Sequence, residues 1–564
     1  MKDEYDVIVI GGGINGLCAA AYLAKAGLEV AVFEARNEVG TFCDTEEVMM
    51  PGVRCNLHAS ALVPWMSPAY DDLEMERFGF RPAFGEWSYI QPFLDGTAYL
   101  RHYYDSEKTY EAWKLLNPKD AETFRHIFNY FVDNGMELAQ EIFYTIPNGR
   151  SFTRAVEIFS KCPGVPENWL NLTAFQVADR MFEDERIKIG LMTVGLEIGY
   201  APWIKAIGSL GFLTVFAVLP WIHAEGGSHA LPHSLYRCFV HYGGEAFQGC
   251  AVEKIIVENG QAKGVVLSPE SVYPDGKIMA SQAVISDLTP VPTFLWLVGE
   301  EHLAPEHVAS IKMYDYEGEV LFTNYYVLNE PLTFKAFEWT DKLDPTVRRD
   351  VYIFNFGAES VGDIYRLQTC ITSGELPDPP IVLGGCFRYT AIDPSQAPPG
   401  MHTVLTWAYG PYNLTKWGGR KLDGPGAWDE VREEYGDRVE DLLAQYAPNI
   451  KTAKVQRYIH TPLDMVRRNP SMLMGTWSGG PMLPQQFYLN RPFPGCGAPR
   501  TPIEKLYITE VNAARATWLL QGYVTACTVA EDLGVRNQEW WNAKPLVPFG
   551  KALARRGIQR KGKF

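Results

Sequence analysis

The chain opens with a strand, a glycine-rich turn, a helix and a second strand, and this run constrains the fold more than any other feature. Residues 5–10 (YDVIVI) are an apolar run typical of a buried parallel strand. The turn 11–16 (GGGING) leads into an alanine-rich helix expected over 17–26. A second strand follows over 29–33 and ends at Glu34. This order predicts a βαβ unit that binds a dinucleotide.

The residue types of the turn each suit contact with a cofactor. Gly11 permits the tight turn, Gly13 lets the backbone approach a pyrophosphate, and Gly16 permits close contact between helix and strand. Ile14 and Asn15 lead into the helix, whose N-terminus offers free N–H groups and a partial positive charge to the phosphates. We therefore expect all five residues to contact the cofactor.

The acidic residue at the end of the second strand narrows the choice of cofactor. Glu34 lies 21 residues after Gly13, where a carboxylate can accept hydrogen bonds from ribose hydroxyls and disfavours a 2′-phosphate, and hence NADP. The fingerprint alone does not separate FAD from NAD. The stretch 34–40 (EARNEVG) resembles FAD enzymes of the glutathione-reductase type, which implies FAD. Ala35 and Gly40 are then further expected contacts.

The rest of the chain predicts how the domains are arranged. A length of 564 residues suggests two or three domains, and 47% hydrophobic with 21% charged residues is typical of a globular protein. The fold class predicted is α/β: a Rossmann-type FAD-binding domain of the glutathione-reductase or amine-oxidase type, built from three segments, with an inserted α+β substrate domain and a helical lid. The expected boundaries are 1–104, 226–295 and 465–543 for FAD binding, 105–225 for the helical region, 296–464 for the substrate domain and 544–564 for a basic tail.

The net charge and the cysteines limit which partners and which cellular compartment we expect. The net charge of −16 argues against nucleic acid as a partner. Seven basic and no acidic residues stand from Lys544 onward, so this tail is either a disordered solubilising segment or a docking site for an anionic membrane surface. The ten cysteines are scattered without a CxxC pair, and no signal peptide is recognised. We expect a cytoplasmic protein, with peripheral membrane association as an open alternative.

Four stretches resemble the carotenoid (phytoene) desaturase family of FAD oxidoreductases. They are the βαβ fingerprint, residues 226–232 (GGSHALP) with the strands after them, residues 393–402 (DPSQAPPGMH), and residues 491–507, so the resemblance spans nearly the whole chain. It implies an FAD enzyme that removes hydride from an allylic carbon of an apolar, isoprenoid substrate. Further cofactor contacts implied are Thr41, Val252, Glu510, Val511, Trp518 and Leu519.

The chain departs from the family pattern around the expected flavin. Asn56-Leu57-His58-Ala59 stands where the family has a small glycine-containing turn, and residues 512–518 (NAARATW) replace a Gly-rich motif. These changes favour a substrate smaller than a forty-carbon carotene, with desaturation or allylic hydroxylation as the reaction. The alternatives are a polyene isomerase or saturase, an amine oxidase, and a non-catalytic prenyl-binding protein of the Rab GDP-dissociation-inhibitor type. An unidentified electron acceptor is implied for the oxidoreductase.

Three residues are candidates for catalysis. The resemblance places His58 beside the flavin, where an imidazole can accept a proton or orient a water; its alternative role is a hydrogen-bonded core histidine. Glu197 and Tyr200 precede a long apolar run, where a carboxylate would have a raised pKa, and structural roles are open for both. His223, His229 and His233 match no compact ligand spacing, so the sequence predicts no metal site.

Overall fold

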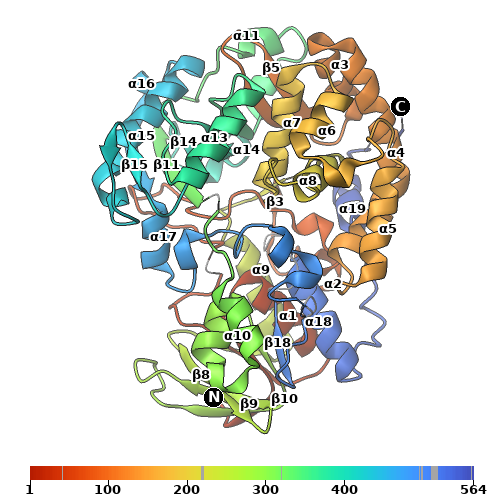
Figure 1. Ribbon diagram of the computed structural model, residues 1–564, viewed down its shortest axis with the longest axis vertical. Helices are drawn as coiled ribbons and strands as arrows, with labels where there is room; N and C mark the ends of the chain where they lie inside the picture. The colour runs from red at the N-terminus through yellow and green to blue at the C-terminus, as the bar shows by residue number, and fades with distance from the viewer. Residues whose placement is uncertain are drawn as a thin grey trace.

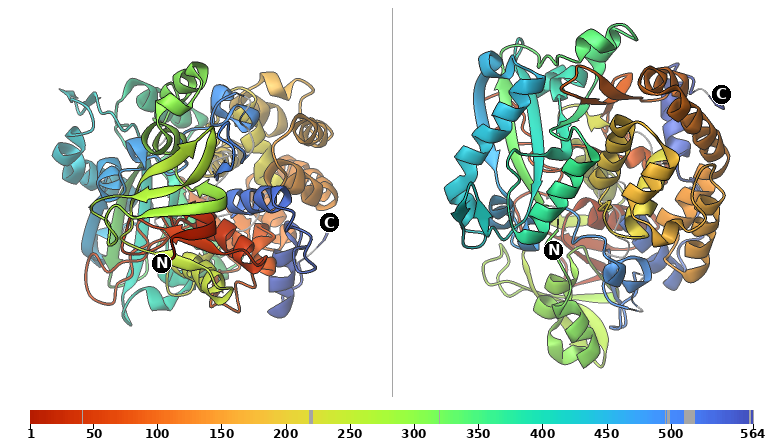
Figure 2. Two further views of the ribbon diagram at one scale, coloured as in Figure 1. Left: turned by 90° about the horizontal axis from the view of Figure 1, so that it is seen from below. Right: turned by 45° about the horizontal axis from the view of Figure 1, so that its top comes forward.

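The computed structural model describes residues 1–40, 42–217, 221–318, 320–494, 496, 499–509, 519–560 and 562–563. Two large sheets organise these residues. Figure 1 shows the first sheet and its helices at the lower end of the molecule, and the second sheet beside a group of helices at the upper end. Figure 2 shows the same division from two other sides.

The first sheet combines segments that lie far apart in the sequence. Its order is β7-β2-β1-β10-β9-β8, and β18 pairs with the C-terminal part of β10. The contacts among β7, β2, β1, β10 and β18 are parallel, whereas β8, β9 and the start of β10 pair antiparallel. The strands are β1 (Glu4–Ile10), β2 (Val30–Phe33), β7 (Glu245–Phe247), β8 (Val252–Glu258), β9 (Gln261–Leu267), β10 (Lys277–Ser286) and β18 (Leu506–Ile508).

Helix α1 (Ile14–Lys25) is the centre of packing in this part of the molecule. It contacts α9 (Ala230–His241) on one side and α18 (Leu520–Asp532) on the other. A glycine of α18 allows the close approach, because a Cβ built on Gly522 would lie 2.4 Å from the carbonyl oxygen of Asn15. The prediction of an α/β Rossmann-type domain built from three chain segments is confirmed.

The second sheet is mostly antiparallel and runs β17-β11-β14-β13-β12-β4-β5. Its strands are β4 (Trp87–Pro92), β5 (Ala98–His102), β11 (Val320–Leu328), β12 (Ile353–Phe356), β13 (Val382–Phe387), β14 (His402–Gly410) and β17 (Lys454–His460). The longer helices of this part are α13 (Val361–Ser373), α15 (Ala427–Tyr446) and α17 (Pro462–Arg468), whereas α10 (Pro305–Lys312) lies with the first sheet. Figure 1 shows α13 and α15 beside the strands of the second sheet.

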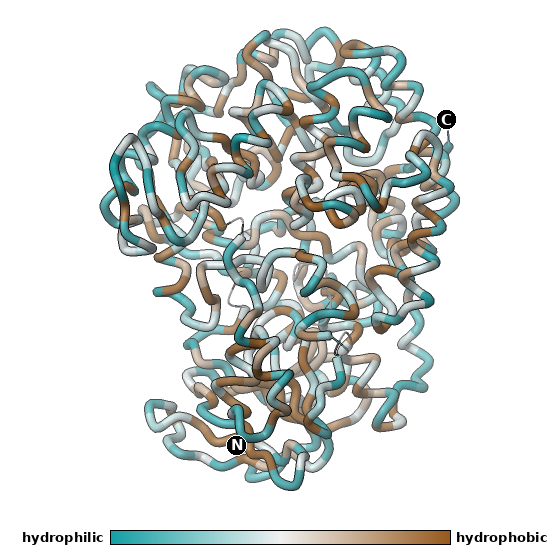
Figure 3. Tube along the Cα trace, in the orientation of Figure 1, coloured by the Kyte–Doolittle hydropathy of each residue, from teal (hydrophilic) through white to brown (hydrophobic). Residues whose placement is uncertain are grey.

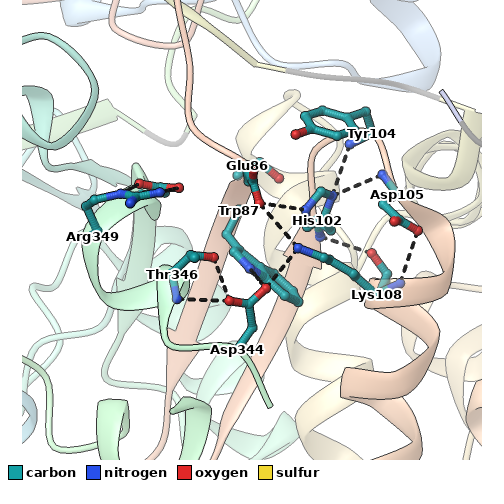
Figure 4. A network of polar contacts seen from close by, with 12 residues as sticks. Glu86, Trp87, His102, Tyr104, Asp105, Lys108, Asp344, Thr346 and Arg349 are labelled. Carbon is teal, nitrogen blue, oxygen red and sulfur yellow. Dashed lines mark hydrogen bonds and ion pairs between the residues drawn. The ribbon is translucent and has the colours of Figure 1, made fainter. Parts of the chain in front are cut away.

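Two strands of the second sheet come from the N-terminal segment. The sequence assigns all of 1–104 to the cofactor-binding domain, but β4 pairs in parallel with β12 of the second sheet. A polar network joins these strands to the later segment, as Figure 4 shows. The ammonium of Lys108 lies 3.2 Å from Glu86 and 2.9 Å from Asp344, and the indole of Trp87 donates to Asp344 at 3.3 Å.

Residues 106–217 form the helical region at the right of Figure 1: α3 (Ser106–Leu116), α4 (Pro118–Phe143), α5 (Gly149–Ser160), α6 (Ala174–Met181), α7 (Glu185–Glu197) and α8 (Ile207–Ala217). In Figure 3 the long outer helices alternate between hydrophilic and hydrophobic colours, as expected when one face packs inward. Residues 177–192 do not form one helix, because Asp184 accepts a hydrogen bond from the N–H of Arg186 and caps a new helix there.

The apolar run before residue 222 forms α8, which is buried along nearly its whole length. Within the described residues no helix is both long and apolar enough to cross a membrane.

The basic C-terminal segment is folded rather than disordered over its described part. Helix α19 (Val547–Arg555) buries Phe549 against Trp65, with ring centroids 5.6 Å apart. Lys551 lies 2.6 Å from Asp71, and other basic residues of this segment also face carboxylates. Part of the positive charge is therefore balanced within the molecule, and membrane docking stays a prediction.

Candidate active site

A long channel lies where β1, β2 and β10 end. It has a volume of about 1710 Å³ and is lined along one side by the glycine-rich turn. The predicted contacts that line it are Gly11, Gly13, Ile14, Asn15, Glu34, Ala35, Gly40 and Val252. The carboxyl ends of parallel strands are the usual place for a nucleotide in such a sheet.

Close neighbours of the turn leave no room for side chains at two of its glycines. A Cβ built on Gly13 would lie 2.4 Å from the Oδ2 atom of Asp287. A Cβ on Gly16 would lie 2.5 Å from the carbonyl oxygen of Gly11, so Gly16 serves packing and is not among the residues that line the channel. The backbone of Gly11 has φ +96°, a conformation that favours glycine. The turn therefore brings the main chain directly to the channel wall.

Glu34 is buried at the end of β2. Its two carboxylate oxygens accept hydrogen bonds from the N–H groups of Gly12 at 2.7 Å and Arg36 at 2.8 Å. Burial raises the pKa of the Glu34 carboxyl, and these two N–H groups act in the opposite direction. Each oxygen keeps a second lone pair, so the carboxylate can still accept a hydrogen bond from a ribose hydroxyl in the channel.

The other predicted cofactor contacts differ in where they lie relative to the channel. The side-chain amide of Asn15 donates to Gln521 at 2.8 Å, which joins α1 to α18 at the channel wall. Leu519 is buried at the start of α18 and does not line the channel. Thr41, Glu510, Val511 and Trp518 lie outside the described residues.

A second, mostly apolar cavity of about 790 Å³ lies next to this channel. The two spaces have Phe42 and Trp477 in common. The cavity is lined by Phe42, His58, Ala59, Ser60, Ala61, Glu197, Ile198, Trp221, Leu321, Gly384, Gly385, Phe387, Trp407, Met465 and Trp477. A molecule in the channel and a molecule in the cavity would therefore meet at the two shared aromatic residues.

His58 is held in one orientation at the cavity wall. Its Nδ1 lies 3.1 Å from a carboxylate oxygen of Asp44. Because an ionised carboxylate can only accept, Nδ1 carries the proton and Nε2 is the basic nitrogen. Burial works against the charge of Asp44, but His58 and Arg468 outweigh it and lower the pKa of Asp44 to about 2. The guanidinium of Arg468 lies 2.7 Å from the same oxygen.

Glu197 lines the same cavity from the end of α7. The amide of Asn355, in β12, donates to Glu197 and also contacts the hydroxyl of Tyr89 at 2.8 Å. The side-chain oxygen Oδ1 of Asn355 accepts a hydrogen bond from the N–H of Gly385 at 3.1 Å. Strands β4, β12 and β13 thus hold the carboxylate at the wall, and the structure brings His58 and Glu197 to one cavity.

Tyr200 is placed elsewhere. It is buried, it packs edge-on against Phe487, and it is not among the residues that line the cavity. A Cβ built on Gly211 of α8 would lie 2.1 Å from the Cβ of Tyr200. The chain leaves α7 just after Glu197 and turns, so the two residues face different neighbours although they are three positions apart.

Several residues of the site were not found from the sequence. Gly385 has φ +87°, and a Cβ built there would lie 3.6 Å from the carboxyl carbon of Glu197. The pair Gly384–Gly385 inside an apolar strand is the signal that could have indicated a close approach. Asp44 and Arg468, which lie far apart in the sequence, had no such signal.

A further apolar pocket of about 950 Å³ lies between the helical region and residues 484–490. Its lining includes Phe152, Ala155 and Leu210, and it has no lining residue in common with the channel.

Comparison with known proteins agrees with this geometry. Residues 9–74 match the NAD(P)-binding Rossmann-like domain. The chain is 30% identical over 563 residues to one of the subunits of the limonene dehydrogenase of Castellaniella defragrans, an alignment that covers 95% of this chain and 96% of that protein. It is 23% identical over 290 residues to a zeta-carotene-forming phytoene desaturase of Myxococcus xanthus, covering 50% of this chain and 52% of the desaturase.

Among solved structures, a putrescine oxidase variant superimposes with a TM-score of 0.57 at 15% identity, over 94% of this chain and 99% of the oxidase, which shows a shared fold. The fold, the channel and the full-length similarity agree with the resemblance seen in the sequence. The chain belongs to the carotenoid (phytoene) desaturase family of FAD-dependent oxidoreductases.

Proposed function

We propose that the protein uses FAD to remove hydride from an allylic carbon of a small apolar terpenoid. The observation that carries this proposal is the contact between the two spaces at Phe42 and Trp477. A cofactor that fills the channel would present its reactive end at these residues, and an apolar substrate in the cavity would lie against it.

The channel residues fit FAD. The turn lacks side chains where a pyrophosphate would approach, and no side chain caps the N-terminus of α1 at Gly13, so its first N–H groups suit phosphate oxygens. Glu34 can accept from the ribose. Gly13 and Asn15 would hold the pyrophosphate end, and Phe42 and Trp477 would flank the flavin end.

The cavity supports an apolar substrate of moderate size. Its wall is mainly aromatic and aliphatic, as in sites that bind apolar small molecules. One relative that matches nearly the whole chain is a limonene dehydrogenase subunit, whose name indicates a monoterpene. The apolar wall suits a terpenoid, and the similarity to this relative favours a monoterpene over a forty-carbon carotene.

The chemistry divides between cofactor and protein. Bound FAD supplies the acceptor for the hydride that leaves the allylic C–H bond. The resulting cation is delocalised, and it either loses a proton to give a new double bond or captures water to give an allylic alcohol. His58 accepts the released proton at Nε2 in both cases, and Asp44 holds the ring and stabilises its protonated form. Repeated turnover would require an electron acceptor for the bound cofactor.

Glu197 is the second ionisable group of the cavity wall. Its carboxylate is fixed by Asn355, so it can orient a water molecule on the apolar face of the substrate. Desaturation needs no such water, whereas hydroxylation does. Glu197 therefore matters more if the product is an alcohol.

The test is anaerobic incubation of the yellow protein with a cyclic monoterpene, a forty-carbon carotene or a primary amine. We expect the monoterpene to bleach the flavin absorbance, with ¹⁸O from labelled water in the product only if the reaction is a hydroxylation. Bleaching by the amine alone would indicate an amine oxidase. A colourless protein that binds isoprenoids would indicate a non-catalytic binder. An isomerised or saturated product would indicate an isomerase or a saturase instead of a dehydrogenase.

A further inference from the structure

Three potential metal ligands meet on the surface beside the loop that follows β2. Glu38 comes from this loop, and His229 and His233 come from the start of α9. One ligand atom from each lies within 4.8 Å of the other two. The two histidines are four residues apart in helical backbone, so they project from the same face.

The protonation of His229 follows from its backbone contact. Its Nε2 lies 3.0 Å from the carbonyl oxygen of Val39, which can only accept, so Nε2 carries a hydrogen. Its Nδ1 lies 3.1 Å from an oxygen of Glu38. With Nδ1 unprotonated, two lone pairs would face each other there, so this contact requires either a second proton on the ring or a cation between the two atoms. A histidine that donates one N–H to a carbonyl and offers the other nitrogen is the usual arrangement of a metal ligand.

The distances fit a tetrahedral ion. Zinc bonds to nitrogen and oxygen are about 2.0–2.1 Å, so tetrahedral ligand atoms lie about 3.3 Å apart. The oxygen of Glu38 lies 3.1 Å from Nδ1 of His229 and 3.7 Å from Nε2 of His233. The histidine rings have centroids 3.9 Å apart and are tilted by 42°, which lets both nitrogens turn toward a common point.

We propose that Glu38, His229 and His233 form a binding site for a divalent transition-metal ion of the zinc type, with water as the fourth ligand. The side chains of Glu38 and His233 are 52% and 42% exposed, so an ion can enter from solvent. The spacing of the histidines alone did not indicate this site, because the third ligand is about 190 residues away in the sequence.

The ion would join the loop 34–40 to α9. This loop carries Glu34 and Gly40, which line the cofactor channel, and a Cβ built on Gly40 would lie 2.6 Å from the ring of Pro232. Neither Glu38 nor His233 lines the channel. Metal binding should therefore stabilise this region without being needed for cofactor binding.

The test is a titration of the chelator-treated, tag-free holoenzyme with zinc chloride, followed by calorimetry. We expect one zinc ion per chain, and an increase of the melting temperature with zinc. His233→Ala and Glu38→Gln should each weaken zinc binding at least about tenfold, because even outer-shell changes cost that much. The FAD content of both variants should equal that of the wild type.

The matched control is His241→Ala, an exposed histidine at the end of the same helix. This variant should bind zinc like the wild type. If the wild-type protein binds no zinc, or if the three variants bind it equally, the site does not exist. Because Glu38→Gln is nearly isosteric and exposed, it keeps the test valid if His233→Ala fails to fold.

Discussion

The channel and the cavity have two lining residues in common, yet their walls differ in kind. One side of the channel is main chain from one short run, residues 10–15, and the rest of its wall comes from 33–42, 251–289, 468–479, 509 and 521. The cavity wall is mainly apolar side chains, with the main chain of Gly384 and Gly385, and it is collected from 42–61, 197–221, 321, 384–407 and 465–477. We expect cofactor binding to depend mainly on the glycine-rich turn, and substrate choice to depend on the side chains of the cavity.

The difference predicts different mutational responses. A change in the channel should remove the cofactor and with it every activity. A change in the cavity should leave the cofactor in place and alter turnover or substrate choice.

The largest effect is expected for Gly13→Val. The added side chain would collide with Asp287 and occupy the phosphate approach, so the FAD content per chain should fall nearly to zero. Gly135→Val is the control, because a Cβ there meets no atom within 4 Å. Absorbance at the flavin band relative to protein measures both. Equal flavin content in the two variants would show that the cofactor does not lie along this turn.

His58→Ala should affect turnover and leave the cofactor bound. Positioned acid–base groups contribute about 10²–10⁴-fold, and His58 is the best-oriented such group in the cavity. Product formation should fall by that range, with unchanged flavin content. Normal turnover on the true substrate would make His58 a packing residue.

Ala61→Phe should test the cavity against the further apolar pocket. Filling a substrate site with an added ring should lower kcat/KM by about 10–200-fold. Ala155→Phe places the same ring in the pocket by residues 484–490 and should leave kcat/KM unchanged. If Ala155→Phe has the larger effect, the substrate binds in or passes through that pocket instead.

The smallest effect is a pH dependence of stability. Burial lowers the pKa of His223 to about 4, against about 6.5 in the unfolded chain. Between these values only the unfolded state takes up the proton, so His223 makes the free energy of unfolding fall by about 1.4 kcal/mol for each pH unit of acidification. His223→Phe should flatten the dependence of the melting temperature on pH from 6.5 to 4.5. An unchanged slope would contradict the assignment.

The sequence predicts the channel better than the cavity for a physical reason. Gly11, Gly13 and Glu34 act through local backbone geometry, which a short motif specifies. His58 and Glu197 were predicted as catalytic candidates, and both line the cavity. Tyr200 was also a candidate, but it is close to Glu197 only along the sequence and does not line the cavity. Whether a side chain faces a cavity depends on strand pairing between segments hundreds of residues apart. The pattern of a single sequence does not predict that pairing.

The first sheet and the second sheet also differ in how far the sequence predicts them. Two parallel strands of the first sheet, β1 and β2, are predicted by the short apolar runs on either side of the glycine-rich turn and its helix. The sequence does not predict that β4 and β5 belong to the second sheet, because the parallel pairing of β4 with β12 joins residues more than 250 positions apart.

We propose that an apolar terpenoid binds in the cavity, against a flavin that reaches Phe42 and Trp477. The most direct measurement is a crystal structure of the FAD-loaded protein soaked anaerobically with a cyclic monoterpene. We expect density for the monoterpene between His58 and Trp407, with its allylic carbon facing the flavin ring. Density in the pocket by residues 484–490, with the cavity filled only by water, would contradict it.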